Sequence, residues 1–463
     1  MKQTFRKNQI FTAPVTDMNN LGYGVCRVDG MVCFVAGAVT GDVIEGKIIK
    51  TASGYLVGRL EKLTEPSPYR RKRACPISKR CGGCSFDGVD HAYELEAKRG
   101  IVEAAFRREG LAVTVEETVS DGRVYGYRNK VAYPADGGRV GYYGAHSHDI
   151  IDCGGRCPLA SPLIDPVSAY IAEAIKKNPV PSLKHIYIRA GEGTGEAAVC
   201  FVSKSGDVSP YKDLADALIT EFPHIVGVTV NVNPADTNVI LGKEYITLRG
   251  REYIEDKLCG LRFRVSPASF WQVNRGMAEL LYKSAAEKAG MKPGERLLDL
   301  FCGTGSVGLA MAADLPGVRL TGVEIVPEAV ENARRNAAEN GVKNAEFICA
   351  DANAVDIGEY DVIAVDPPRR GLAPELIERI ADSGNRRVVY ISCNPATLAR
   401  DCRLFAARGY ATGEATPFDL FPRTGHVETV VLLCRKNIDD HLEFMWTDEE
   451  FGDHVRTKKV VKK

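Results

Sequence analysis

The sequence contains no apolar run that approaches the roughly 20 residues needed to cross a lipid bilayer. Its first seven residues also lack the apolar core of a secretory signal peptide. We therefore expect a protein of the cytoplasm that has no membrane partner. No internal repeat is present either, so nothing in the sequence indicates a repeat architecture.

The formal net charge is zero, because 60 Lys and Arg residues balance 60 Asp and Glu residues. The balance hides an uneven distribution: residues 1–80 hold 14 basic and 6 acidic residues, a surplus of +8, and the remaining 383 residues carry −8. A basic N-terminal region is suited to a polyanion such as RNA. Charge alone is equally compatible with a solvated basic surface that has no partner.

The chain does have length and apolar content. A chain of 463 residues, of which 45% are hydrophobic, is too long to fold around one ordinary hydrophobic core. We therefore expect a soluble protein of several domains. The 14 cysteines are not expected to form a disulfide framework, because the cytosol keeps thiols reduced. Cysteines that cluster in such a chain usually serve metal or redox chemistry.

Residues 1–66 are expected to form a small OB-like β-barrel. Apolar runs at 25–28, 32–35 and 43–49 indicate short strands, and Asp29 followed by Gly30 between the first two is a strong hairpin signal. The Pro-containing stretch at 64–68 then ends the regular structure. Basic barrels of this kind commonly bind single-stranded nucleic acid.

Residues 67–270 mix strands and helices less regularly and are expected to form a central α/β domain. Helices are predicted at 93–108 and 161–177, and basic residues at 70–73 precede a group of cysteines. Residues 271–440 alternate cleanly between helices and strands, which predicts a doubly wound, Rossmann-like parallel sheet. The elements expected there are helices at 275–289 and 327–340 and strands at 296–301, 319–323, 346–350, 361–365, 388–391 and 427–433. The segment 441–463 is expected to be a C-terminal tail, whose lysine-containing end at 458–463 is expected to be disordered.

A glycine-rich turn follows the first of these strands and predicts a cofactor site. Gly303, Gly305 and Gly308 fit the G-x-G-x-x-G pattern, and Glu324 ends the next strand, where a carboxylate reaches ribose hydroxyls. The pattern alone is compatible with a dinucleotide such as NAD. Asp299, which stands just before the first glycine, suits the amino group of S-adenosylmethionine better than it suits a pyrophosphate.

Three further residues at strand ends carry candidate chemistry. Asp366 opens an Asp-Pro-Pro-Arg turn after strand 361–365, so its carboxylate faces the same crevice as the glycine-rich turn. Cys393 follows strand 388–391, and Glu428 supplies a carboxylate in the same domain. A thiol and a carboxylate are a possible nucleophile and base for covalent catalysis. Base rates alone favour a buried structural cysteine and an outward-facing strand residue instead.

Cys75, Cys81 and Cys84 stand in a Cys-x5-Cys-x2-Cys pattern that predicts a metal site. The fourth ligand must come from elsewhere in the chain, and we expect Cys157, with Cys153 as the alternative. Four thiolates suit zinc or an iron–sulfur cluster equally in number. Structural zinc sites usually show two close pairs, so the three-plus-one spacing favours the cluster.

Taken together, these motifs resemble the RNA uracil-5-methyltransferase family, and within it the bacterial 23S ribosomal RNA enzymes that carry an N-terminal TRAM domain and a [4Fe-4S] cluster. The most specific stretches are Ser-Cys-Asn-Pro around Cys393, Asp-Pro-Pro-Arg from Asp366, and Asp-Leu-Phe-Pro followed by His-Val-Glu up to Glu428. The resemblance covers nearly the whole chain. It implies a nucleophile, Cys393; a proton acceptor, Glu428; an S-adenosylmethionine-binding set of Gln272, Phe301, Ser306, Glu324, Asp351 and Asp366; and cluster ligands Cys75, Cys81, Cys84 and Cys157.

The family resemblance also implies the reaction and its partners. Members methylate carbon 5 of a uridine through a covalent bond between a cysteine and carbon 6, so the target base must be single-stranded or flipped out. We expect 23S ribosomal RNA as the substrate, a monomeric enzyme, and a basic barrel that contacts the RNA backbone. The alternatives are a transfer RNA substrate, a non-catalytic RNA-binding protein, and an NAD-dependent dehydrogenase built on the same glycine-rich turn.

Overall fold

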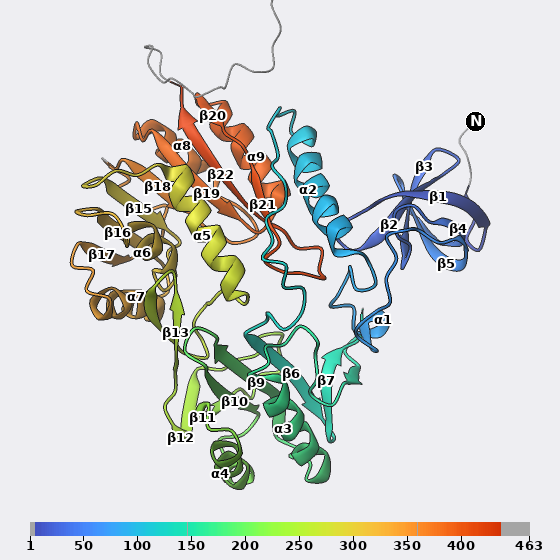
Figure 1. Ribbon diagram of the computed structural model, residues 1–463, viewed down its shortest axis with the longest axis horizontal. Helices are drawn as coiled ribbons and strands as arrows, with labels where there is room; N and C mark the ends of the chain where they lie inside the picture. The colour runs from blue at the N-terminus through green and yellow to red at the C-terminus, as the bar shows by residue number, and fades with distance from the viewer. Residues whose placement is uncertain (1–4, 146, 359, 437–463) are drawn as a thin grey trace, which may run out of the picture.

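The computed structural model describes residues 5–145, 147–358 and 360–436, and Figure 1 shows their arrangement. A barrel, a central sheet and a C-terminal sheet follow one another along the chain. No helix within the described ranges is long and apolar enough to cross a membrane. The expected tail at 441–463 lies outside the described residues.

Five strands form the N-terminal barrel: β1 (Ile10–Met18), β2 (Tyr23–Val28), β3 (Met31–Ala36), β4 (Val43–Thr51) and β5 (Leu56–Glu65). They close in the order β1-β2-β3-β5-β4, which confirms the predicted barrel. The predicted hairpin joins β2 to β3, where Asp29 and Gly30 adopt φ angles of 47° and 85°. Positive φ at both central positions gives a turn whose twist matches that of the flanking strands.

The central sheet has seven strands in the order β12-β11-β10-β9-β6-β7-β8, and helices α3 and α4 share one buried core with it. Helix α3 begins at Asp165 rather than at the expected position 161. Pro166 explains the difference, because proline fits the first helical turn but lacks the N–H that an interior position needs. The elements are β6 (Lys130–Asp136), β7 (Arg139–Tyr143), β8 (Ile150–Asp152), α3 (Asp165–Lys177), β9 (Leu183–Gly191), β10 (Glu196–Ser203), a 3-10 turn (Ser209–Tyr211), α4 (Lys212–Glu221), β11 (Ile225–Val232) and β12 (Glu244–Gly250).

A hairpin, β13 (Ile254–Leu258) and β14 (Leu261–Val265), leads into the C-terminal part. The strands there are β15 (Arg296–Leu300), β16 (Arg319–Glu324), β17 (Ala345–Cys349), β18 (Val362–Val365), β19 (Arg387–Ser392), β20 (Tyr410–Thr412), β21 (Thr416–Phe418) and β22 (Glu428–Arg435). The helices are α5 (Arg275–Ala289), α6 (Ser306–Ala312), α7 (Pro327–Glu339), α8 (Pro374–Asp382) and α9 (Pro395–Ala406).

The C-terminal sheet runs in the order β17-β16-β15-β18-β19-β22-β20, with β21 paired to β22. The first five strands in this order are parallel, which confirms the predicted doubly wound core. Strand β22 is antiparallel to β19, a departure from the expected all-parallel sheet. A loop rather than a helical crossover leads into β22, so the chain returns in the opposite direction.

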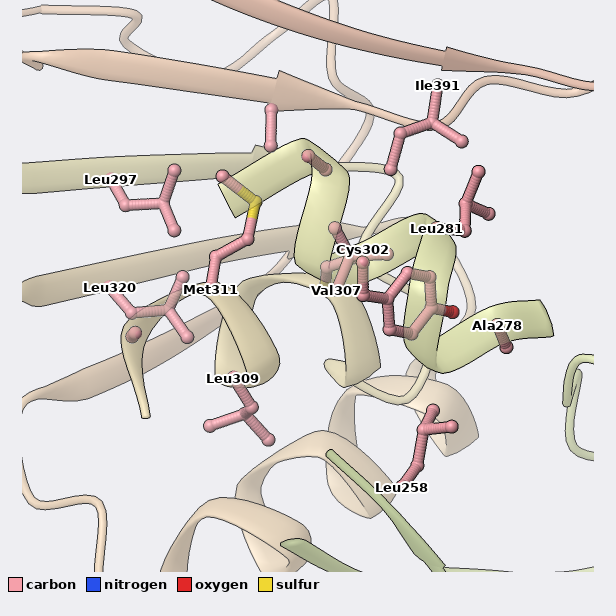
Figure 2. Close-up of a cluster of buried hydrophobic side chains, with 14 of the residues drawn as sticks. Leu258, Ala278, Leu281, Leu297, Cys302, Val307, Leu309, Met311, Leu320 and Ile391 are labelled. Carbon is pink, nitrogen blue, oxygen red and sulfur yellow. The ribbon is translucent and has the colours of Figure 1, made fainter. Parts of the chain in front are cut away.

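Both faces of this sheet are covered, as buried parallel strands require. Figure 2 shows part of the core on one face, where Leu297 of β15 and Leu320 of β16 share a cluster with Leu281 of α5 and with Leu309 and Met311 of α6. The opposite face packs against α8 and α9. With both faces filled, the carboxyl ends of the strands are the place left for a ligand.

Two further helices, α1 (Ser78–Cys81) and α2 (His91–Arg108), lie between the barrel and the central sheet in sequence. Helix α2 begins two residues before the expected start because the Asp90 side chain accepts a hydrogen bond from the Ala92 amide at 3.0 Å. Its Val102 and Phe106 are buried in the same cluster as α8 and α9 of the C-terminal sheet. Helix α2 therefore packs beside α9 rather than on the central sheet (Figure 1).

Candidate functional site

A cavity of about 970 Å³ opens at the carboxyl ends of the parallel strands of the C-terminal sheet. Turns after β15, β16, β18 and β19 contribute to its wall, together with the start of β22. Its size lies at the upper end of the range for small-molecule sites. All eight side chains that the sequence assigned to the cofactor and to catalysis line it: Gln272, Phe301, Ser306, Glu324, Asp351, Asp366, Cys393 and Glu428.

The turn between β15 and α6 brings bare backbone to this cavity. Phe301 and Gly305 both adopt left-handed backbone, with φ angles of 65° and 80°, the former a strained conformation for a residue with a side chain. A Cβ atom on Gly305 would lie 3.0 Å from the Phe347 ring, so the position requires glycine on two grounds. The Gly303 amide donates to Glu324 Oε2 at 3.2 Å, which ties the turn to the end of β16.

Asp299 does not line the cavity. Its Oδ2 accepts a hydrogen bond from the Gly308 amide at 2.8 Å, in the first turns of α6, and burial raises the pKa of its carboxyl to about 7. The carboxylate therefore lies beneath the turn and fastens α6 to β15. The structure does not bring it to the position that the sequence interpretation assigned to it, beside the amino group of S-adenosylmethionine.

Three cofactor candidates reach the cavity from other elements. Ser306 is the first residue of α6. Gln272 is buried before α5, and its backbone carbonyl accepts from Asn129 Nδ2 at 2.9 Å, which fastens this segment to the central sheet. Asp351 is exposed after β17, and its Oδ1 accepts from the backbone and side-chain nitrogens of Asn353 at 2.8 and 2.9 Å.

Asp366 stands directly after β18, at the start of its Pro-containing turn. Burial raises the pKa of its carboxyl to about 7, so this side chain gains or loses a proton near neutral pH. The turn is tied to α9, because the Arg369 carbonyl accepts from Asn394 Nδ2 at 2.9 Å and from Thr397 Oγ1 at 3.3 Å. These hydrogen bonds join the turn that carries Asp366 to the start of α9, beside Cys393, so the two side chains reach the cavity from connected segments.

Cys393 lies between β19 and α9, where Asn394 caps the helix by accepting from a first-turn amide at 3.1 Å. Burial raises the pKa of the Cys393 thiol to about 11, and the negative charges of Glu428 and Asp366 act in the same direction. Arg369 acts in the opposite direction. The thiol is therefore protonated at neutral pH in the free enzyme, and it needs a change in its surroundings to react as a thiolate.

Glu428 is the first residue of β22 and is only 5% exposed. It is not the outward-facing strand residue that base rates favour, because the first half of β22 is buried on both faces. Burial raises the pKa of the Glu428 carboxyl to about 8, Asp366 adds to the rise, and Arg369 opposes it. Raised pKa values at several acids around one cavity are typical of functional sites.

Several side chains that line the cavity were not assigned by the sequence. Phe270 is 68% exposed, and Tyr282 shares a hydrogen bond of 3.1 Å with the first residue of α6. The His426 ring packs edge-on against Phe421, with centroids 5.8 Å apart. His426 and Arg369 stand inside the motifs that carried the family resemblance, so a signal was present for them. Phe270 and Tyr282 lie in stretches without a motif.

Four thiols surround a second, smaller cavity: Cys75, Cys81, Cys84 and Cys157. Cys153 does not line it, so the geometry favours Cys157 over its alternative. Burial raises the pKa of the Cys75, Cys81 and Cys84 thiols. Among the residues that the structure describes, no three His, Cys, Asp or Glu side chains are grouped so that they could hold a single metal ion.

Known proteins resemble this chain over nearly its full length. Residues 209–436 match the family model described as tRNA (Uracil-5-)-methyltransferase. An uncharacterized RNA methyltransferase of Clostridium acetobutylicum is 35% identical over 453 residues, which cover 93% of this chain and 98% of that protein. A second, from Halalkalibacterium halodurans, is 36% identical over 452 residues, with 93% and 98% covered.

A solved structure shares the fold as well. The crystal structure of the Pyrococcus abyssi tRNA (uracil-54, C5)-methyltransferase in complex with S-adenosyl-L-homocysteine has a TM-score of 0.73 and 27% sequence identity. The similarity covers 91% of this chain and 100% of that one. These matches leave the dehydrogenase alternative without support. The chain belongs to the RNA uracil-5-methyltransferase family and is an S-adenosylmethionine-dependent RNA methyltransferase.

Proposed function

We propose that this enzyme transfers a methyl group from S-adenosylmethionine to carbon 5 of a uridine in RNA, and that the RNA is 23S ribosomal RNA. The supporting observation is that Cys393, Asp366 and Glu428 line the same cavity as the glycine-rich turn. A thiol beside a buried carboxylate suits covalent catalysis. Direct methyl transfer to an atom that is already nucleophilic would need no thiol.

Carbon 5 of uracil is a poor nucleophile, and the Cys393 thiolate changes this by adding to carbon 6. The electron pair of the 5,6 double bond then moves toward the carbonyl at carbon 4 and forms an enolate. Carbon 5 of the enolate attacks the methyl group, and the sulfur of S-adenosylmethionine leaves with the bonding pair. Glu428 removes the proton from carbon 5, the double bond re-forms and the thiolate is released.

The charges around the cavity fit this order of events. The pKa values of about 11 at Cys393 and about 8 at Glu428 leave both groups largely protonated at neutral pH in the free enzyme. S-adenosylmethionine carries a positive sulfonium group, and a cation in the cavity lowers the pKa of every acid around it. Binding of the methyl donor therefore favours the thiolate and the carboxylate that the reaction needs.

Six side chains are proposed to bind S-adenosylmethionine. Glu324 is the clearest, because its carboxylate accepts from the amides of Gly303 and Val326 at 3.2 and 3.0 Å, at the strand end where ribose hydroxyls bind in such folds. The remaining members contribute apolar contact, a hydroxyl and polar groups around the same cavity. The full set is Gln272, Phe301, Ser306, Glu324, Asp351 and Asp366.

The RNA substrate is argued from charge and from family resemblance. Residues 1–80 carry a surplus of eight positive charges that suits an RNA backbone, and the target uridine must be flipped out to reach Cys393. We assign 1–66 to a TRAM-type barrel, 67–270 to a central domain with the cysteine cluster and 271–440 to the methyltransferase domain of a monomeric enzyme. The Pyrococcus abyssi neighbour acts on a transfer RNA, which makes transfer RNA the second candidate. Mapping 5-methyluridine in both RNAs from a deletion strain decides between them.

Cys75, Cys81, Cys84 and Cys157 are proposed to hold a [4Fe-4S] cluster. A cluster of this type takes one thiolate on each iron, so its ligands surround the cluster instead of meeting on one ion. Four thiols around one cavity fit that requirement, and the group would fasten the segment of α1 to the segment at 157. Protein purified without oxygen should contain about four iron atoms per chain, and Cys84→Ser should lose them. Stoichiometric zinc without iron would show that the cluster assignment is wrong.

Glu428→Gln tests the covalent mechanism. Addition of Cys393 and methyl transfer remain possible in this variant, and only proton removal is blocked, so methylated RNA should accumulate as a covalent adduct on a denaturing gel. Cys393→Ala should form no adduct and should not methylate RNA. Cys349→Ala is the matched control, because this exposed thiol lies outside the cavity.

Two outcomes would change the assignment. A Cys393→Ala enzyme that still methylates RNA would exclude the covalent mechanism. A Glu428→Gln enzyme with unchanged turnover would place the base elsewhere, and Asp366 is the next carboxylate to test.

A further inference from the structure

The loop at 419–427, between β21 and β22, is largely buried, although connections between strands usually lie on the surface. Arg423 and Thr424 at its centre are only 6% and 4% exposed. The loop starts directly after Phe418, and Phe418 pairs with Glu428 across the two strands. The shape of this loop therefore sets the position from which Glu428 enters the cavity.

Four consecutive carbonyl groups of the loop accept hydrogen bonds from residues far away in the sequence. None of these donors belongs to β21 or β22, so the loop conformation depends on other parts of the chain. The bonds run from Asn274 Nδ2 to Leu420 at 3.2 Å, from Lys98 Nζ to Phe421 at 3.1 Å, from the Tyr127 hydroxyl to Pro422 at 2.9 Å and from the Phe86 amide to Arg423 at 3.0 Å.

Lys98 of α2 lies at the centre of this arrangement and is fully buried. Its ammonium group donates to Glu94 Oε1 at 2.9 Å, to Asp419 Oδ1 and to the Phe421 carbonyl. Three donors thus meet three acceptors, as a buried charge requires. Asp419 Oδ2 lies 2.8 Å from His91 Nε2, which adds a second contact between α2 and the start of the loop.

Glu94 fixes the second half of the loop through Arg423. Its Oε1 accepts from the Arg423 amide at 2.6 Å and its Oε2 from Arg423 Nη1 at 3.3 Å, while the same Nη1 donates to the Val89 carbonyl at 2.7 Å. Arg423 has a φ of 69°, which is strained for a residue with a side chain. Such a conformation persists only where the surroundings hold it.

We propose that Lys98 and Glu94 are positioning residues for Glu428. Helix α2 carries both, and their buried charge network holds the loop in the shape that brings the Glu428 carboxylate into the cavity. Neither residue is among those that line the cavity, so both act through the loop. This role rests on the assignment of Glu428 as the base that removes the carbon-5 proton.

Lys98→Arg and Glu94→Gln test the role. Both keep side chains of similar size but change the geometry or the charge of the network, so proton removal should slow while addition and methyl transfer continue. The methylated covalent adduct should then decay about 10- to 100-fold more slowly than in the unmutated enzyme. The measurement is a chase of labelled adduct on denaturing gels, with thermal unfolding measured alongside. If Lys98→Arg fails to fold, Glu94→Gln carries the test, because glutamine keeps an acceptor for the Arg423 amide.

Glu295→Gln is the matched control. It breaks an ion pair with Arg387, with Nη2 to Oε1 at 2.7 Å, that lies at the amino-terminal ends of β15 and β19, away from the cavity. This variant should lower the melting temperature without slowing adduct decay. Lys98 or Glu94 variants that behave like Glu295→Gln would show that the network is merely structural, and the positioning role would be wrong.

A double variant separates the two assignments. Because Lys98→Arg and Glu428→Gln are expected to impair the same step, combining them should slow adduct decay no further than Glu428→Gln alone. Additive slowing would contradict the positioning role. If Glu428→Gln itself accumulates no adduct, the assignment of the base fails, and this result is distinct from a failure of the network alone.

Discussion

Alkylation of Cys393 in the free enzyme should follow the pH dependence of a thiol whose pKa is about 11. Burial is the largest cause of this raised pKa, and the charges of Glu428 and Asp366 add to it. A raised pKa favours the protonated thiol, so the reactive thiolate is scarce at neutral pH. Its amount rises tenfold with each pH unit until the pH approaches the pKa.

The size of the effect follows from the two pKa values. At pH 7.5, a thiol with a pKa of about 11 is roughly one part in 3,000 thiolate, whereas the usual value of 9.0 gives roughly one part in 30. Cys393 should therefore react with iodoacetamide about 100-fold more slowly at this pH than a thiol of ordinary pKa. Above pH 8, where Glu428 is ionised, Glu428→Gln removes one of the charges that raise the pKa of Cys393, so it should speed up alkylation there.

The assay is iodoacetamide labelling between pH 7 and 10, with modified peptides quantified by mass spectrometry. The exposed Cys349 reports reagent access in the same digest. S-adenosylmethionine should shift the Cys393 profile to lower pH more than S-adenosylhomocysteine does, because only the former carries a sulfonium charge. A profile with its midpoint at or below pH 9 in the free enzyme would refute this account of the electrostatics.

Two further predictions concern the cofactor and the barrel. S-adenosylhomocysteine at 100 times its Kd should raise the unfolding free energy by about 2.7 kcal/mol, whereas NAD should give no shift in a thermal melt; stabilisation by NAD alone would reopen the dehydrogenase alternative. Gly425→Ala should destabilise the protein by about 1–3 kcal/mol, because its Cβ would lie 1.7 Å from the Asn20 carbonyl oxygen of the barrel. Gly54→Ala, which meets nothing within 4 Å, is the control, and equal melting temperatures for the two variants would contradict this contact.

The strands of the C-terminal sheet were predictable because strands buried on both faces leave continuous apolar runs, as at 362–365 and 388–391. The direction in which these strands pair was harder to predict from the sequence. The run at 427–433 identified a strand, but its antiparallel direction depends on the loop at 419–427 and on β21, and apolar periodicity carries no information about pairing partners. The start of helix α3 was also predicted wrongly from apolar periodicity. Pro166 places that start at Asp165, because proline fits only the first helical turn.

The candidate site was predictable to the extent that motifs follow strand ends, where side chains reach the crevice. Asp366 and Cys393 stand directly after β18 and β19 and line the cavity as expected. Asp299 lies inside β15, where side chains alternate between the two faces of the sheet, and it therefore points toward α6 instead of the crevice. Position relative to the strand end thus decides which acid lines the cavity.

The charge network on α2 was not predictable from the sequence because its members are distant from one another. Lys98 lies on a helix with an ordinary mixture of charges, and a lysine in such a helix is usually solvated. Its burial depends on Asp419, which comes 321 positions later. No local pattern links the two residues, so only the fold reveals that α2 packs beside the loop that leads to Glu428.

The loop at 419–427 consequently connects the cavity at the strand ends to the barrel and to the segment of the cysteines. Cys393 follows a strand end of the C-terminal sheet, whereas Glu428 follows a loop that contacts α2, the Phe86 segment beside the cysteines, and Asn20 of the barrel at Gly425. In the proposed mechanism, proton removal by Glu428 therefore depends more directly on this loop than the addition of Cys393 does. A disturbance of the barrel or of the cysteine segment should slow proton removal more than methyl transfer, because Glu428 directly follows the loop, whereas the loop reaches the rest of the cavity only through Phe421 and His426.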